Sequence, residues 1–305
     1  MPPAKRLEVE IDGRTLSLSN LDKVLYPKAG FTKGQVIDYY TRVAPVLLPH
    51  LRDRPLTLKR YPNGVEGQFF YEKNCPSHRP DWVRTAAVWS RHAKRTINFC
   101  IADDLPTLVW TSNLADLELH TSLAKVDDVA APVILAFDLD PGPPATIVEC
   151  AEVAVRLREI FEHLGLQSFP KTSGSKGMQV YVPLNTPTTY GVTKPFALGL
   201  AQLLERRHPE LVVSDMKKVL RTGKVLVDWS QNDEHKTTVA VYSLRAKDFP
   251  TVSTPITWDE VEGVLASRDP DDLVFDSAAV LARVAEHGDL FAPVETLQQE
   301  LPATG

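Results

Sequence analysis

Apolar residues recur at helical spacing in several segments, and two of these segments open with a clear capping signal. Thr32-Lys33-Gly34-Gln35 forms a capping box. It predicts a helix that buries one apolar face. Thr146 opens a second capping box, and the helix that it predicts should end before Gly165. The buried face of the first helix should consist of Val36, Tyr39, Tyr40, Val43 and Leu47. Further helices are predicted over residues 105–123, 194–207, 257–267 and 277–287.

Short apolar runs bounded by turn residues predict strands. Residues 134–137 read as a buried strand that PGPP interrupts, and residues 178–182 as another. KVLVDWS (224–230) and KTTVAVYSL (236–244) predict two strands joined by a hairpin-like connection. Strands mixed with helices, including one strand–helix–strand unit, indicate an α/β (α+β) fold. We expect a single domain over residues 1–292 and a frayed tail over residues 293–305.

Charge and composition narrow the class of protein. The net charge of −5 argues against a general nucleic-acid binder, but no Asp or Glu occurs from His163 to Leu204, and MKKVLRTGK (216–224) is basic. A basic surface of this kind either binds phosphates or is an ordinary solvated surface, and the composition does not decide between these two interpretations. We interpret the three scattered cysteines as buried small side chains, without a disulfide or zinc site. No apolar run of transmembrane length and no signal peptide is present, so we expect a cytoplasmic protein without a membrane partner.

Two aspartates follow the apolar run of VILAFDLDPG. Asp138 and Asp140 point to the same side of a strand, with Cα atoms about 6.5 to 7 Å apart. Two carboxylates so placed bind divalent cations such as Mg²⁺ or Mn²⁺, or they cap a turn in solvent. Asp228 ends another apolar strand and is a candidate third acid. Three such acids are the ligands that two-metal phosphoryl or nucleotidyl transfer requires. A DxD pair also occurs in glycosyltransferases and phosphatases.

A glycine- and serine-rich segment, KTSGSKG, precedes the predicted strand at residue 178. The amides and hydroxyls of Ser173, Gly174 and Ser175 are candidates to bind phosphate oxygens, with Lys176 as a nearby charge. The segment is not a Walker A motif. Taken alone it is equally a flexible turn.

These segments together carry a resemblance to a known family. The chain resembles the polymerase domain of bacterial ligase D, of the archaeo-eukaryotic primase superfamily, over roughly residues 15–290. The resemblance implies a primase-like catalytic core, in which an α/β module and an RRM-like module flank a central cleft. It rests on these segments, which occur in this order: LSNLDKVLYPKAGFTKGQVIDYY, KRYPNGVEGQFFYEK, LELHTS, LAFDLDPG, TSGSKG, RTGKVLVDWSQN, KTT and YSLR.

The resemblance also implies roles for individual residues. The two catalytic ions, Mn²⁺ or Mg²⁺, would be bound by Asp138, Asp140 and Asp228. The nucleotide would be bound by Lys59, His120, Ser173, Gly174, Ser175, Lys176, Arg221 and Arg245. The DNA 5′-phosphate would be bound by Asn20, Lys23 and Lys33, where Lys33 opens a helix beside exposed amides. Phe69 and Phe70 would contact the template; without the family they would be assigned to the core.

The chain departs from the family pattern at two places. Gln179 stands where members commonly carry a histidine, and glutamine brings a hydrogen bond without charge. The nearest match to a ligase KxDG motif is EIDG (10–13), which lacks the lysine. We therefore expect no ligase activity, and a product that passes to a separate DNA ligase.

The expected function is DNA-directed addition of ribonucleotides, and of dNTPs, to a 3′-hydroxyl at gaps or broken ends that bear a 5′-phosphate. Its setting would be end joining or gap filling on nucleoid DNA. Expected partners are NTPs, the DNA, the separate ligase and an end-binding protein, and the expected state is a monomer. Two alternatives stay open, a metal-dependent glycosyltransferase or phosphatase and a non-catalytic DNA-end-binding module.

Overall fold

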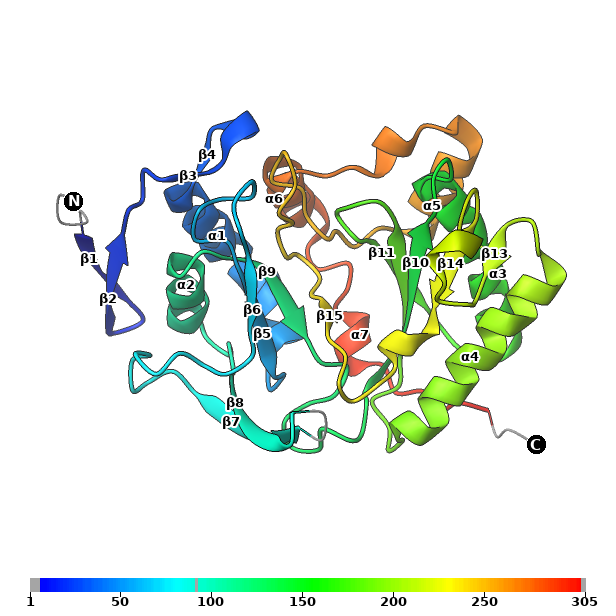
Figure 1. Cartoon of the computed structure of the whole chain (residues 1–305), viewed down its shortest axis with the longest axis horizontal. Helices are drawn as coiled ribbons and strands as arrows, with labels where there is room; N and C mark the ends of the chain where they lie inside the picture. The colour runs from blue at the N-terminus through cyan, green and yellow to red at the C-terminus, as the bar shows by residue number, and fades with distance from the viewer. Residues whose placement is uncertain (1–5, 91–92, 303–305) are drawn as a thin grey trace. The chain divides into compact units, whose positions relative to one another are not determined.

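The computed structural model describes residues 6–90 and 93–302, and its mixed helices and strands confirm the expected fold class (Figure 1). The chain forms two compact units, and each is assembled from separate stretches of sequence. The first unit contains the described residues up to Thr121, then Val239–Val252 and Asp276–Gly288. The second contains Ser122–Thr238, Ser253–Phe275 and the described residues from Asp289 onward.

The main sheet of the first unit has the strand order β15-β9-β5-β8-β7, and β6 also pairs with β5. Two short antiparallel pairs, β1-β2 and β3-β4, precede it. The described elements are β1 (Arg6–Ile11), β2 (Arg14–Ser19), β3 (Val24–Tyr26), η1 (Pro27–Ala29), β4 (Phe31–Thr32), α1 (Lys33–Leu51), β5 (Leu56–Arg60), β6 (Phe70–Glu72), β7 (Thr85–Ser90), β8 (Arg95–Cys100), α2 (Leu105–Asn113), β9 (Asp116–Thr121), β15 (Thr238–Val239) and α6 (Ser277–His287).

Helix α1 begins as its sequence predicts. The Thr32 hydroxyl accepts from the Gln35 amide, and the Gln35 side chain accepts from the Thr32 amide, which completes the capping box. All five residues of the predicted apolar face are buried. Two of them also anchor the helix, since the hydroxyl of Tyr39 donates to the Tyr242 carbonyl and that of Tyr40 to the Leu117 carbonyl.

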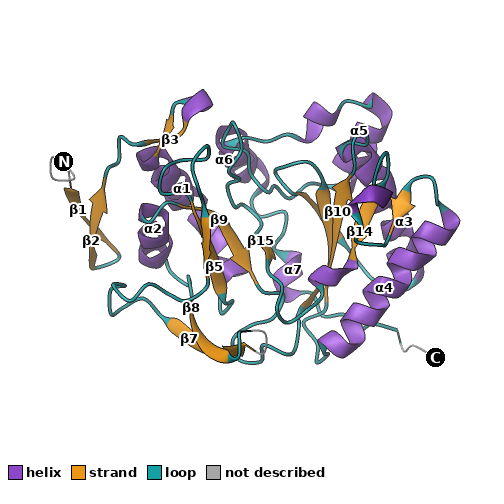
Figure 2. Ribbon diagram, viewed as in Figure 1, coloured by secondary structure: helices purple, strands orange, loops and turns teal. Residues whose placement is uncertain are grey.

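The second unit is built on a five-stranded sheet of order β11-β12-β10-β14-β13, in which only β13 and β14 run parallel. Figure 2 labels two of its strands, β10 and β14. Thr146 caps α3 through the predicted capping box, and Gly165 follows with a φ of 73°. The elements are β10 (Ile134–Pro141), α3 (Ile147–His163), β11 (Phe169–Thr172), β12 (Met178–Pro183), α4 (Tyr190–Arg207), β13 (Val212–Val213), η2 (Lys218–Leu220), β14 (Val225–Asp228), η3 (Trp229–Gln231), α5 (Trp258–Ser267), η4 (Pro270–Leu273) and α7 (Pro293–Thr296).

The two faces of this second sheet differ in chemistry. Phe137 and Leu139 of β10 lie in a buried apolar cluster with residues of α3 and α4. Side chains alternate along a strand, so Asp138 and Asp140 point to the other face. Burial of one face therefore fixes where the carboxylates lie.

Two element predictions are wrong. The helix expected over residues 105–123 ends at Asn113, and a turn with Ala115 at a φ of 60° leads into β9. Leu117 and Leu119 are fully buried and alternate with polar residues, a period of two that the helical interpretation missed. The hairpin expected at 224–244 does not form, because β14 pairs with β10 and β13 whereas β15 pairs with β9. In place of a tight turn, η3 follows Asp228.

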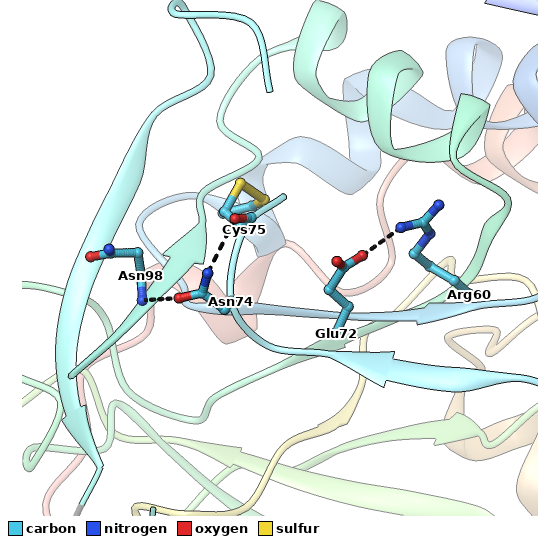
Figure 3. The surroundings of a disulfide bond; sticks show 6 residues. Arg60, Glu72, Asn74, Cys75 and Asn98 are labelled. Atoms are coloured by element: carbon cyan, nitrogen blue, oxygen red, sulfur yellow. Dashed lines mark hydrogen bonds and ion pairs between the residues drawn. A yellow bond between two sulfur atoms is a disulfide. The ribbon is translucent and has the colours of Figure 1, made fainter. Parts of the chain in front are cut away.

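The interpretation of all three cysteines as free thiols is also wrong. Cys75 and Cys100 form a disulfide across 25 residues, and Cys150 alone is free and buried. The loop after β6 lies along β8, where the Cys75 amide donates to the Asn98 carbonyl and the Asn98 amide donates to the Asn74 side chain (Figure 3). This pairing brings the two cysteines together, and no local spacing in the sequence signals it.

The segment from Pro293 was expected to be frayed, and the structure packs its described part. Val294 in α7 is buried. The side chain of Gln299 donates to the carbonyls of Gln167 and Pro183, and its own amide donates to the Leu184 carbonyl. Within residues 6–90 and 93–302, no helix has the length and apolar character needed to cross a membrane.

Candidate functional site

The three candidate metal-binding carboxylates lie on neighbouring strands of the second unit. Asp138 in β10 is the direct antiparallel partner of Asp228 in β14, and Asp140 follows two residues further along β10. Directly opposite residues project to the same face. The structure thus brings Asp138, Asp140 and Asp228 to one sheet face, which sequence spacing alone could not establish for Asp228.

Each carboxylate is hydrogen-bonded to other protein groups. Asp228 accepts from the backbone and hydroxyl of Ser230 and from the side chain of Gln231, at 2.6 to 2.9 Å. Asp140 accepts from Arg221 at 3.2 Å. Among the side chains that the structure describes, no three His, Cys, Asp or Glu groups converge as a metal ion requires. The carboxylates are therefore neighbours whose oxygens are turned to protein donors.

The electrostatics of Asp138 reflect this crowding. The pKa of Asp138 is raised to about 6: burial raises it most, the charges of Asp228 and Asp140 also raise it, and a hydrogen bond from Gln179 opposes the shift. Because the site disfavours the ionised form, a cation in reach of these oxygens would be bound favourably. The donor set, carboxylate oxygens alone, suits the hard ions Mg²⁺ and Mn²⁺.

Gln179, the residue that departs from the family pattern, serves the carboxylates. It lies opposite Asp138 in β12, and its amide nitrogen donates to Asp138 Oδ1 at 3.1 Å and to Thr238 Oγ1 at 2.9 Å. The side chain is buried. The sequence indicates a side chain that brings one hydrogen bond without charge, and the structure commits the amide of Gln179 to Asp138.

A buried lysine extends the same row. Lys171 in β11 lies opposite Gln179 in β12, so it projects to the carboxylate face. Its ammonium donates to Ser253 Oγ at 2.6 Å and lies 5.4 Å from the centre of the Tyr181 ring. Its positive charge lowers the pKa of Asp138. Sequence reasoning missed Lys171, although it stands next to the TSGSKG segment.

The TSGSKG segment forms a tight loop between β11 and β12. The hydroxyl of Ser173 accepts from the amides of Ser175 and Gly177, at 3.2 and 3.3 Å. Gly177 is required by close approach, since a Cβ there would lie 2.0 Å from the Leu139 carbonyl oxygen. The amide of Ser175 is thus bonded within the loop, and Lys176 is exposed. The loop therefore offers the charge of Lys176 to a ligand, but fewer backbone amides than its glycine- and serine-rich composition suggests.

Arg221 lies beside the carboxylates. One terminal nitrogen donates to Asp140 and the other donates to the Met216 carbonyl at 2.7 Å. A Cβ on Gly142 would lie 1.9 Å from the Arg221 carbonyl oxygen, so glycine permits this approach. The Nε of Arg221 is buried and has no hydrogen-bond partner among the described residues.

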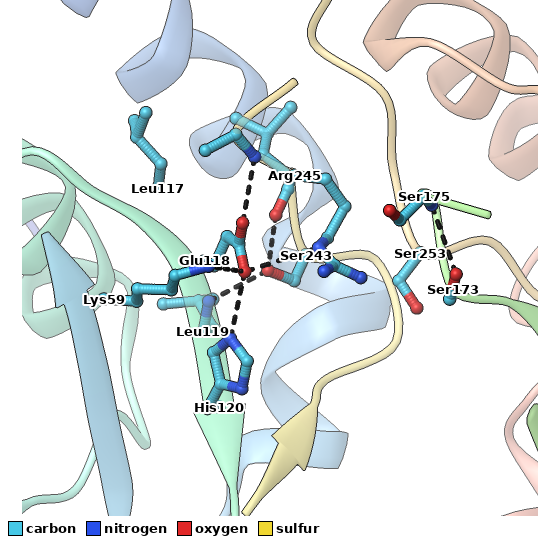
Figure 4. Close-up of polar contacts among 12 residues, drawn as sticks. Lys59, Leu117, Glu118, Leu119, His120, Ser173, Ser175, Ser243, Arg245 and Ser253 are labelled. Atoms are coloured by element: carbon cyan, nitrogen blue, oxygen red, sulfur yellow. Dashed lines mark hydrogen bonds and ion pairs between the residues drawn. The ribbon is translucent and has the colours of Figure 1, made fainter. Parts of the chain in front are cut away.

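The remaining nucleotide-binding candidates gather in the first unit around a residue that the sequence did not single out (Figure 4). Glu118 in β9 lies 3.0 Å from Lys59 Nζ, 3.1 Å from His120 Nε2 and 3.4 Å from Arg245 Nε. His120 lies on strand β9, which corrects its assignment to a helix. The structure therefore unites Lys59, His120 and Arg245, which come from three distant parts of the sequence.

Phe69 and Phe70 are both exposed, at 49% and 43%, so they are not core residues. They contact different cations: the Lys59 ammonium lies 4.8 Å from the Phe69 ring centre, and the Arg60 guanidinium lies 5.1 Å from that of Phe70. Lys59 and Arg60 are consecutive on β5 and point to opposite faces. The pair consequently presents two separate aromatic surfaces.

The three 5′-phosphate candidates are brought together where β2 meets α1. Asn20 turns the chain with a φ of 55°, and its carbonyl accepts from the Lys23 amide. The Lys33 ammonium donates to the Ser19 carbonyl at 2.6 Å. Burial, together with the charges of Lys23 and Arg60, lowers the pKa of Lys33 to about 8.

The helix amides beside Lys33 are occupied, contrary to expectation. The amide of Lys33 donates to the Lys23 carbonyl, that of Gly34 to the Leu21 carbonyl, and that of Gln35 to the Thr32 hydroxyl. A phosphate here would therefore be bound by side chains, and the helix N-terminus contributes fewer contacts than the sequence suggested.

Comparison with known proteins agrees with this geometry. The family described as "LigD, primase-polymerase domain" matches residues 32–291. The solved polymerase domain of Mycobacterium tuberculosis ligase D, in complex with DNA, superposes with a TM-score of 0.86 at 40% identity, covering 93% of this chain and 99% of that one. Fold and site thus define a primase-polymerase, an enzyme of the nucleotidyltransferase class. The chain belongs to the LigD primase-polymerase domain family.

Full-length relatives are considerably longer. The multifunctional non-homologous end joining protein LigD of Mycolicibacterium smegmatis is 42% identical over 91% of this chain and 36% of its own length. LigD of M. tuberculosis is 41% identical over 94% of this chain and 37% of its own length. The chain thus spans less than half the length of these curated relatives.

Proposed function

We propose that this chain is a DNA-directed nucleotidyltransferase that adds ribonucleotides, and also dNTPs, to a 3′-hydroxyl at gaps or broken ends bearing a 5′-phosphate. The observation that carries the proposal is the antiparallel pairing of Asp138 with Asp228, which with Asp140 sets three carboxylates on one sheet face. Family membership and the DNA bound to the M. tuberculosis domain support DNA as the substrate.

The three carboxylates are proposed to hold two divalent ions, Mn²⁺ or Mg²⁺. The raised pKa of Asp138 supports this role, because burial, together with the charges of Asp228 and Asp140, disfavours the carboxylate form, which a bound cation would stabilise. When bound, such ions would activate the 3′-hydroxyl and neutralise the pyrophosphate leaving group. Gln179 would keep Asp138 oriented throughout, because its amide is already bonded to that side chain.

The candidate triphosphate-binding groups are basic and polar side chains, which are described here for each unit by itself. In the second unit, Arg221 offers a guanidinium group beside Asp140, and Lys176 offers an exposed charge on the loop of Ser173, Gly174 and Ser175. In the first unit, Lys59 and Arg245 offer positive charge. These groups would bind and orient the nucleotide, which is most of what protein side chains contribute to phosphoryl transfer.

The DNA is proposed to be recognised by the first unit. Asn20, Lys23 and Lys33 would bind the 5′-phosphate, and the exposed rings of Phe69 and Phe70 would stack on template bases. A DNA ligase would seal the product, and an end-binding protein would present the break in the cytoplasm.

Primer extension on a short gapped duplex with manganese tests the proposal. Incorporation of NTPs is compared with that of dNTPs, and incorporation at a gap with a downstream 5′-phosphate is compared with that at a gap with a 5′-hydroxyl. The double variant Asp138→Ala/Asp140→Ala removes two of the carboxylates. The matched control, Glu159→Ala/Asp259→Ala, removes two exposed carboxylates elsewhere in the second unit. Templated incorporation should occur in wild type and control, improve with the 5′-phosphate, and be lost in the double variant.

A different result would assign a different function. Phosphate-dependent DNA binding that survives the double substitution, without incorporation by the wild type, would identify a non-catalytic end-binding module. Incorporation that persists in the double variant would place the chemistry elsewhere.

A further inference from the structure

Glu118 is a buried carboxylate of the first unit with five polar partners, and no part of the proposed reaction uses it directly. Its side chain is 2% exposed. One oxygen, Oε2, is approached by Lys59, His120 and Arg245. The other, Oε1, accepts from the Ala246 amide at 3.1 Å and from the Tyr61 hydroxyl at 3.4 Å. Both carboxylate oxygens of Glu118 therefore have protein partners. Figure 4 shows Glu118 among Lys59, His120 and Arg245.

An anion buried this deeply persists only if its partners compensate it. Burial raises the pKa of Glu118, but the hydrogen bond from His120 and the charges of Arg245 and Lys59 outweigh burial and hold that pKa well below its usual range. Glu118 is consequently ionised at neutral pH and carries no proton to donate.

The ionised carboxylate determines the state of His120. Oε2 of Glu118 can only accept, so the hydrogen between the two side chains must lie on His120 Nε2. Burial lowers the pKa of His120, which keeps the ring neutral. A neutral ring protonated on Nε2 has a lone pair on Nδ1, and Nδ1 is therefore a hydrogen-bond acceptor.

The surroundings of the cluster suit a nucleotide. The exposed fraction of the side chain is 12% for Lys59, 16% for Arg245 and 13% for His120. That of Glu118 is only 2%, so Glu118 lies beneath these three groups. The ring of Tyr71 lies 5.9 Å from the His120 ring and 5.7 Å from the Lys59 ammonium, which adds an aromatic surface.

We propose that Glu118 is a positioning residue that holds Lys59 and Arg245 ready for an anion and holds His120 as a neutral acceptor. His120 then receives a hydrogen bond from a hydroxyl or amine of the nucleotide. It does not bind a phosphate oxygen, because two lone pairs repel. This inference rests on the proposed function for the identity of the ligand, but the state of His120 does not depend on it.

Nitrogen NMR of the full chain with ¹⁵N-labelled histidine tests the state of His120 without any activity. The His120→Gln variant assigns the resonance among the eight histidines. At pH 7 the wild type should show a neutral ring protonated on Nε2. Glu118→Gln should redistribute the proton between the two nitrogens. A charged ring, or a ring protonated on Nδ1 in the wild type, would overturn the inference.

Incorporation kinetics test the positioning role. Glu118→Gln removes the charge, and the KM for the nucleotide should rise about tenfold while kcat changes less than about twofold, since charge-assisted hydrogen bonds to the binding groups are lost. Glu118→Asp keeps the charge and should restore part of the affinity. The matched control is Glu72→Gln, which breaks the Arg60–Glu72 ion pair of the same unit (Figure 3) and should leave KM unchanged.

The outcomes separate this inference from the proposed function. A folded Glu118→Gln protein with wild-type KM would refute the positioning role. If the Glu118→Gln variant does not fold, the KM of Glu118→Asp and the protonation state of His120 in the wild type still test the inference. If the wild type incorporates no nucleotide, the proposed function fails, whereas the tautomer measurement continues to test Glu118.

Discussion

The pKa of Lys33 should give the proposed 5′-phosphate pocket a pH dependence that an ordinary lysine does not confer. Burial and the charges of Lys23 and Arg60 lower this pKa to about 8. About 90% of the Lys33 side chains are then charged at pH 7 and about 10% at pH 9. A bound phosphate favours the charged form, so phosphate affinity follows this fraction. The gain in DNA affinity from a 5′-phosphate should therefore fall about tenfold between pH 7 and pH 9.

Fluorescence anisotropy on two gapped duplexes measures this gain. The duplexes differ only in a downstream 5′-phosphate or 5′-hydroxyl, and the ratio of their Kd values isolates the phosphate contribution. The second pKa of a phosphomonoester is about 6, so the phosphate keeps nearly constant charge across the range. The change in the ratio consequently reports the protein.

Two variants control the experiment. Lys33→Arg stays charged at every pH tested, and its ratio should be nearly flat. Lys28→Ala removes an exposed lysine that is paired with Asp248, and it should keep the wild-type profile. A wild-type ratio that is well above one at pH 7 and unchanged at pH 9 would refute the reasoning.

Three further outcomes follow from the structure. Asp138→Asn should abolish incorporation, yet raise the metal-free melting temperature at pH 7, because a pKa raised from 3.8 to about 6 costs the folded state about 3 kcal/mol that is relieved as pH falls toward 4. Gly177→Ala should weaken nucleotide binding and lower the melting temperature, since its Cβ would collide with the Leu139 carbonyl. Reduction of the Cys75–Cys100 disulfide should lower the free energy of unfolding by about 3 kcal/mol, measured by urea denaturation beside a thiol count.

Local signals in the sequence predicted local structure well. The capping boxes at Thr32 and Thr146 are both present, and α5 and α6 occupy nearly the predicted residues. These features depend on hydrogen bonds within a few residues, so the sequence around them is sufficient. The DxD pair belongs to the same class, because alternation along one strand decides where its side chains point.

Features that depend on distant pairing were not predictable in the same way. β9 was mistaken for helix because its polar residue Glu118 is buried by partners from β5 and from beyond β15. The disulfide and the split of residues 224–244 between two sheets also arise from long-range pairing. Glu118 lies within the LELHTS segment, but only its convergence with three cationic or titratable groups reveals its role.

Gln179 shows how strand register changes the role of a residue. Seen along the sequence, it follows a phosphate-binding loop and replaces a histidine, which suggests weakened contact with a phosphate. Register instead places it opposite Asp138, with Thr238 and Tyr181 also in hydrogen-bond reach of its amide. A glutamine donates one unchanging hydrogen bond to Asp138 at any pH, whereas a histidine there would donate according to its own protonation. The substitution thus fixes the orientation of a metal-binding candidate, and the buried charge of Lys171 remains to offset the carboxylates.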